Sequence, residues 1–205
     1  MRPGARCALV LAAAMVVAAP YRTAAQSSFG IIAGLNRANF TGGGAVDVSP
    51  RTGPMIGVVG DIPVGPRFSV RPELNFSAKG SQVRTEAGDP ADGPSKTFGV
   101  SYIEMPVLVQ LRSASDGPVR PQLFGGLSAG VLLGCNLGSL DCADVEGIDQ
   151  SGVDVGVVVG VELAMGRIGV GARYEVGVRA VDASVPGNEI YNGVASLTAR
   201  YTLRR

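Results

Sequence analysis

Polar and apolar side chains alternate over unusually long segments, and this alternation constrains the fold more than any other feature of the sequence. In residues 67–77 every odd position is polar and every even position is apolar. Residues 153–163 and 169–179 follow the same two-residue period. A period of two is typical of a β-strand with one polar and one apolar face. The sequence therefore predicts an all-β fold.

Eight segments carry this pattern, and most of them are long for strands. Strands of globular proteins have about five or six residues, whereas a tilted strand that crosses a membrane needs about nine to eleven. The lengths therefore favour a barrel that spans a membrane. The expected strands are 29–37, 54–63, 67–78, 97–112, 119–133, 152–164, 167–179 and 191–203.

The connections between these segments alternate between long and short. Bacterial outer-membrane barrels have long loops on the extracellular side and tight turns on the periplasmic side. The sequence thus predicts an eight-stranded antiparallel up-and-down transmembrane β-barrel, with both termini on the side of the short turns. We expect Lys79 and Lys96 in the second long loop and Tyr102 in an aromatic girdle. The long connections are 38–53, 79–96, 134–151 and 180–190, and the short ones are 64–66, 113–118 and 165–166.

The first 25 residues have the layout of a secretory signal peptide. Arg2 and Arg6 precede an uncharged run over 7–21, and small residues precede an expected cleavage site after Ala25. This run is shorter than the ~20 residues that a membrane-spanning helix needs, although an N-terminal anchor is the alternative. We expect a signal peptide over 1–25, a barrel domain over 26–205, and export through the inner membrane to the bacterial outer membrane.

The composition excludes several classes of function. The chain has no histidine, which removes Ser-His-Asp and Cys-His catalysis and histidine-ligated metals. Its 18 Lys and Arg against 17 Asp and Glu give a net charge of +1, which does not favour nucleic acid. We therefore expect no enzymatic activity, no cofactor, no metal site and no nucleic-acid partner.

If the apolar faces contact lipid, the charged residues face the lumen. Eight strands enclose an interior that side chains just fill, and an unpaired buried charge is very costly. We expect these charges to pair and to plug the lumen, without a large channel. Acid–base chemistry by a carboxylate pair such as Glu73 and Glu104 is the less simple interpretation. The expected lumen network is Arg67, Arg71, Glu73, Glu104, Arg112, Arg120, Asp154, Glu162, Arg173, Glu175, Arg179 and Arg200, with Asp61 also inward.

Alternation alone does not say which face is outside. A soluble lipocalin-like barrel, periplasmic or secreted, would hold an apolar ligand among inward apolar residues and would expose its charges to water. This reverse assignment is the alternative function. The lengths of the strands and the sorting of the loops favour the membrane.

Cys135 and Cys142 lie in one long connection and face an oxidising compartment after export. We expect a disulfide between them, with free thiols or a metal pair as alternatives. The same connection is acidic, with Asp144, Glu146 and Asp149. We expect these carboxylates to keep the loop soluble or to bridge lipopolysaccharide through divalent cations, with a calcium site as the alternative.

Several short motifs resemble the PorT-like family of bacterial outer-membrane β-barrel proteins. Residues 29–36 are similar to its opening strand, which ends in Gly-Leu-Asn, and residues 71–80 to its Pro-Glu-Leu strand, which closes in Lys-Gly. Residues 102–108 are similar to its Tyr-Leu-Glu-Ile-Pro segment, and 121–126 and 172–174 complete the match. The resemblance implies an eight-stranded outer-membrane barrel, with no known reaction for most members and a role beside a secretion machine for one namesake.

As partners we expect outer-membrane lipid, lipopolysaccharide and the barrel-insertion machinery. An unidentified surface or secretion-system partner is a further candidate.

Overall fold

The computed structural model of the chain describes residues 26–41, 48–83, 96–114, 117–138, 140–142, 152–178 and 191–204. The expected signal peptide over 1–25 lies outside these residues. The strands are β1 (Ser28–Thr41), β2 (Val48–Pro63), β3 (Phe68–Val83), β4 (Lys96–Arg112), β5 (Val119–Leu137), β6 (Leu140–Asp141), β7 (Val153–Met165), β8 (Ile168–Gly177) and β9 (Tyr191–Arg204).

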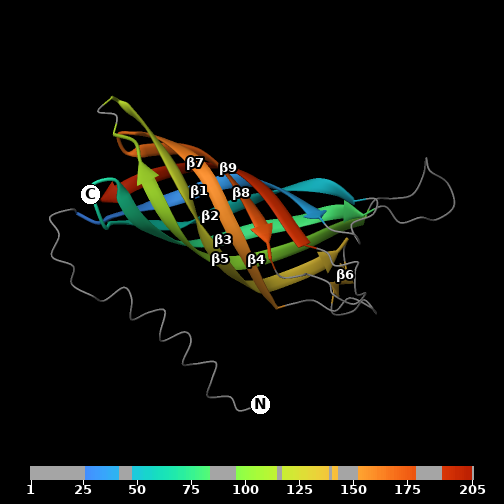
Figure 1. The fold of residues 1–205 in the computed structure, drawn as a ribbon. Helices are drawn as coiled ribbons and strands as arrows, with labels where there is room; N and C mark the ends of the chain where they lie inside the picture. Colours follow the sequence, from blue (N-terminus) through green and yellow to red (C-terminus); the bar gives the residue numbers. More distant parts are fainter. Residues whose placement is uncertain are drawn as a thin grey trace, which may run out of the picture.

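Eight long strands form one closed antiparallel barrel (Figure 1). Each long strand pairs with the next, while β6 adds only a two-residue ladder to the end of β5. The first and last strands, β1 and β9, pair along their length and close the barrel. Closure leaves no open sheet edge, which a bilayer requires of a strand-based protein. The predicted eight-stranded up-and-down barrel is confirmed.

The tight turns lie at one end of the barrel, together with the start of β1 and the end of β9 (Figure 1). The shortest turn joins β7 to β8, where Met165 and Ile168 pair directly. Gly166 has a φ of +58° there, a left-handed conformation that glycine adopts without strain. The segments 42–47, 84–95, 143–151 and 179–190, which contain most of the expected long connections, lie outside the described residues.

Apolar side chains cover the outside of the barrel. On β7 the outward Val157, Val159 and Val161 are 39%, 55% and 50% exposed, while Val158 between them is fully buried. The same alternation holds on β8. Among the residues that the structure describes, no helix has the length and apolar character to cross a membrane. A ligand-holding soluble barrel would show the reverse arrangement, so the lipocalin-like alternative is not favoured.

Small apolar clusters fill the lumen between its charged groups. Leu108, Phe124 and Val158 pack together from β4, β5 and β7. The ring of Phe124 lies against Gly160, where a Cβ atom would come within 2.5 Å of the ring. Glycine at this position therefore makes room for an aromatic ring inside a narrow barrel.

Candidate functional site in the barrel lumen

Five charged side chains cross the lumen as a connected group that we name the arginine cluster: Arg71, Glu73, Glu162, Arg173 and Arg200. Arg71 contacts Glu73 at 2.9 Å through Nε and Glu162 at 2.8 Å through Nη1. Arg173 contacts Glu73 at 2.8 Å, and Arg200 contacts Glu162 at 2.5 Å. Each of the two carboxylates therefore meets two guanidinium groups.

Neutral groups complete the surroundings of Arg71. Its Nη1 donates to the side-chain amide oxygen of Gln110 at 3.3 Å, and its guanidinium lies 5.0 Å from the centre of the Phe124 ring. Guanidinium groups stack well on aromatic faces. Arg71 is thus held on every side, with only 1% of its surface exposed.

A second charged group, which we name the lysine cluster, has the opposite balance of charge. Lys79 lies 3.0 Å from Glu175 and 3.6 Å from Asp154, and it also forms an ion pair with Glu104. All four side chains are buried. Three carboxylate oxygens lie within 4.8 Å of one another, as ligands of a metal ion would. In this structure the ammonium of Lys79 occupies the place of the cation.

An uncharged hydrogen-bond network joins β1, β3 and β9 inside the lumen. The amide of Asn36 donates to Ser77 Oγ at 2.9 Å and accepts from Ser196 Oγ at 2.8 Å. Asn36 is 1% exposed. This network satisfies a buried amide without any charge.

The end of the lumen beyond the lysine cluster is capped by apolar side chains and a disulfide. Cys135 and Cys142 form the disulfide, which packs with Val100 and Tyr102. The ring of Tyr102 is 5.6 Å from the ammonium of Lys79. The disulfide links the end of β5 to the short turn beside β6, so it fixes the chain above the lysine cluster.

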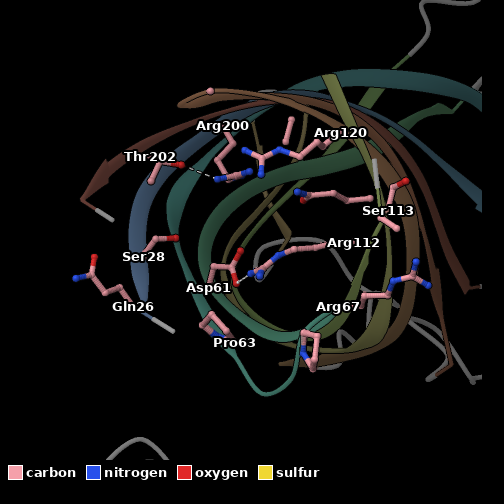
Figure 2. Close-up of a pocket in the computed structure, with 15 residues that line it drawn as sticks. Gln26, Ser28, Asp61, Pro63, Arg67, Arg112, Ser113, Arg120, Arg200 and Thr202 are labelled. Atoms are coloured by element: carbon pink, nitrogen blue, oxygen red, sulfur yellow. Dashed lines mark hydrogen bonds and ion pairs between the residues drawn. The ribbon is translucent and has the colours of Figure 1, made fainter. Parts of the chain in front are cut away.

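The other end of the lumen opens into a cavity of about 760 Å³, which we name the vestibule (Figure 2). Arg112, Arg120 and Arg200 extend from the wall into this mouth (Figure 2). Asp61 pairs with Arg112 at 2.5 Å. Arg67 also lines the cavity, from the turn before β3. The floor of the vestibule meets the arginine cluster at Arg200, which belongs to both.

The structure places most of the expected lumen residues inside the barrel. Arg67 and Arg120 are exposed lining residues of the vestibule, and no ion pair joins them to another described residue. Arg179 lies outside the described residues. The arginine and lysine clusters bring together Arg71, Glu73, Glu104, Asp154, Glu162, Arg173, Glu175 and Arg200, while Arg112 pairs with Asp61.

Two expectations were wrong. Neither Lys79 nor Lys96 is in a loop, because β3 continues to Val83 and β4 begins at Lys96. The side chain of Lys79 lies in the lumen with 2% exposed. Tyr102 is not in a girdle at the membrane surface, since it faces the lumen and is also 2% exposed. For Lys79, the alternation of β3 continues past the residue at which composition suggested that the strand ends. For Tyr102, the alternation of β4 directs the ring into the lumen and not toward the membrane surface.

A family model described as outer membrane protein beta-barrel domain matches residues 23–182. The chain belongs to this family. No curated protein sequence matches it. Among solved structures, the barrel resembles Neisserial surface protein A with a TM-score of 0.54 and 16% identity, over 87% of this chain and 100% of that one. It also resembles Ail, the attachment invasion locus protein of Yersinia pestis, with a TM-score of 0.50 and 12% identity over the same shares.

A third structure, the outer membrane enzyme PagL, has a TM-score of 0.49 and 12% identity, over 83% of this chain and 98% of that one. Family membership and fold agree that the protein is a small β-barrel of the bacterial outer membrane, as the sequence predicted. In such barrels the tight turns face the periplasm. The vestibule therefore opens to the periplasm, and the disulfide-capped end faces the cell exterior.

Proposed function

We propose that the protein is a non-conducting barrel that serves binding or envelope structure through the connections on its extracellular side. The observation that carries this proposal is the arginine cluster, whose ion pairs run across the lumen from β3 to β7, β8 and β9. The side chains of Arg71 and Glu73 are 2% and 0% exposed. An eight-stranded barrel has an interior that side chains fill, and here charged pairs fill it.

Conductance through a planar lipid bilayer tests this proposal. We expect the inserted wild-type protein to leave the bilayer as insulating as a bare membrane. The matched variant replaces Arg71, Glu73, Glu162 and Arg173 by serine, which leaves the net charge of the lumen unchanged while emptying it, and we expect discrete conductance steps from it. Heat-modifiable mobility on a gel checks that both proteins are folded. Steps from the wild-type protein contradict the proposal.

The binding role belongs to the connections over 42–47, 84–95, 143–151 and 179–190. The third of these holds Asp144, Glu146 and Asp149, and divalent cations bridge such carboxylates to the phosphates of lipopolysaccharide. Outer-membrane lipid contacts the apolar belt, and the barrel-insertion machinery contacts the chain during assembly. Retention on immobilised lipopolysaccharide is expected to fall when EDTA is added, and retention that EDTA leaves unchanged contradicts this mode of binding.

Within the family, the motifs over 71–80 and 102–108 support a place in the PorT-like branch. They contain Glu73, Lys79 and Glu104, which belong to the two charged clusters of the lumen. Such a place implies a secretion-system partner on the periplasmic or extracellular face. Deletion of the gene is then expected to lower the amount of secreted protein, and secretion that stays unchanged contradicts this partner.

The lumen carboxylates have a structural role and not a catalytic one. Glu73 and Glu104, the pair considered for acid–base chemistry, contact different cations, Arg71 and Lys79 respectively. Both are sealed from solvent. An activity of the purified protein that disappears with Glu104→Gln while the barrel stays folded contradicts this assignment.

A further inference from the structure

Among the described residues, the charged lining of the vestibule has more positive than negative groups. Asp61 neutralises Arg112, and Glu162 in the floor neutralises Arg200. Within the described part of the chain, no ion pair involves the guanidinium groups of Arg67 and Arg120, the other two arginines of the lining. The charged lining of the cavity is Asp61, Arg67, Arg112, Arg120 and Arg200.

These arginines come from distant parts of the sequence. Arg67 precedes β3, Arg112 ends β4, Arg120 lies at the start of β5 and Arg200 lies near the end of β9. Closure of the barrel brings them to one mouth, where three of them extend into the opening (Figure 2). Like charges held together repel one another. Their convergence therefore favours an anion between them.

We propose that the vestibule binds a small dianion from the periplasm, whose two negative charges are carried by carboxylate or phosphate oxygens. Arg67 and Arg120 supply the two charges that lack a partner. Arg112 and Arg200 supply donors that their own carboxylates already hold in place, and such pre-orientation lowers the entropy lost on binding. Planar guanidinium groups match carboxylate and phosphate oxygens in pairs.

The size and chemistry of the cavity agree with a small ligand. A volume of about 760 Å³ lies within the range of about 300–1,000 Å³ that is typical of small-molecule sites. Neutral donors and acceptors, among them Ser28, Gln122 and Thr202, also line it. The arginine cluster closes the floor, so the ligand is bound at the mouth and not conducted.

Titration of the refolded, ¹⁵N-labelled barrel in octyl glucoside, a detergent without phosphate, tests the proposal. The probes are inorganic phosphate and succinate, at a mildly alkaline pH at which both are dianions, with sodium chloride at equal ionic strength as the reference. We expect saturable shifts of the NMR signals of Arg120 and Gly166 with the dianions, and weaker, non-saturating shifts with chloride. Tighter binding of phosphate identifies a phosphate-type ligand, and tighter binding of succinate identifies a dicarboxylate.

The variant Arg67→Gln with Arg120→Gln removes both unneutralised charges and touches neither buried cluster. Because two charged hydrogen-bond donors are lost, we expect dianion affinity to fall by at least about tenfold, which corresponds to about 1.4 kcal/mol. Arg37→Gln, an exposed arginine on β1 near the extracellular end, is the matched control and is expected to bind as the wild type does.

Three outcomes overturn the proposal: no saturable binding by the wild-type protein, equal effects of chloride and dianions, or unchanged affinity in the double variant. The shifts of the wild-type protein decide the question by themselves if a variant does not fold.

Discussion

The two charged clusters of the lumen differ in their ratio of basic to acidic groups. In the arginine cluster three guanidinium groups share two carboxylates, which leaves one positive charge. In the lysine cluster one ammonium meets three carboxyl groups, an excess of two acidic groups. The first lies on the periplasmic side of the lumen and the second on the extracellular side, beneath the disulfide. The lumen is thus polarised along its axis.

The ion pairs of the arginine cluster are redundant, whereas those of the lysine cluster depend on one residue. Glu73 keeps Arg173 if Arg71 is lost, and Glu162 keeps Arg200. In the lysine cluster, by contrast, every ion pair that the structure describes runs to the same ammonium, that of Lys79. Breaking a buried pair is costly because the remaining charge stays buried without compensation. The lysine cluster is therefore expected to be the more fragile of the two.

The largest effect is expected from Lys79→Met. This change keeps an unbranched side chain of similar length and removes the ammonium that contacts all three buried carboxylates. Removing one partner of a buried ion pair costs about 3–5 kcal/mol, and here one partner serves three pairs. We expect a loss of this size in the free energy of unfolding, or failure to refold. Urea unfolding followed by far-UV circular dichroism measures it, since the chain has no tryptophan.

Two further variants show whether the charge of Lys79 is responsible. Lys79→Met combined with Glu104→Gln and Glu175→Gln leaves one buried carboxylate in place of three, and we expect it to recover part of the lost stability. Arg37→Met removes an exposed cation and is expected to change stability little. A Lys79→Met barrel as stable as the wild type contradicts the account of the lysine cluster.

A smaller effect is expected from Arg71→Met in the arginine cluster. Both carboxylates keep one guanidinium partner, so the loss is that of the charged hydrogen bonds alone, about 2–3 kcal/mol. The same unfolding experiment measures it beside Lys79→Met. If Arg71→Met lowers the free energy of unfolding more than Lys79→Met does, the number of cations around each buried carboxylate does not control stability. That result contradicts the difference drawn between the two clusters.

The fold could be predicted from the sequence because the hydrocarbon core of a bilayer imposes a simple alternating pattern on the side chains of each strand. A two-residue period over ten or more residues reveals the strand, and once strand length and loop sorting indicate a membrane, lipid requires the apolar face to be outward. The expected strand over 152–164 and the observed β7 agree closely for this reason. Strand ends were less visible: β3 and β5 continue past the membrane-length pattern, to Val83 and Leu137.

The ion-pair partners could not be predicted from the sequence. Arg71 and Glu162 are far apart in the chain, and which inward residues share a level depends on the stagger between strands, which alternation does not encode. Lys79, however, was within reach. Like Arg71, Glu73 and Ser77 it stands at an odd position of β3. Extending the two-residue alternation by two residues beyond Ser77 therefore places its side chain in the lumen.

The smallest effect is expected from Asn36→Ala, which removes a buried polar group of no charge beside the lysine cluster. The hydroxyls of Ser77 and Ser196 lose their amide partner, and a neutral hydrogen bond contributes about 1 kcal/mol. Urea unfolding is again the measurement, with Ser196→Ala as the companion variant that removes one of the three hydrogen bonds of Asn36. A loss as large as that of Arg71→Met would mean that filling the lumen with polar groups, and not the balance of its charges, sets the stability of the barrel.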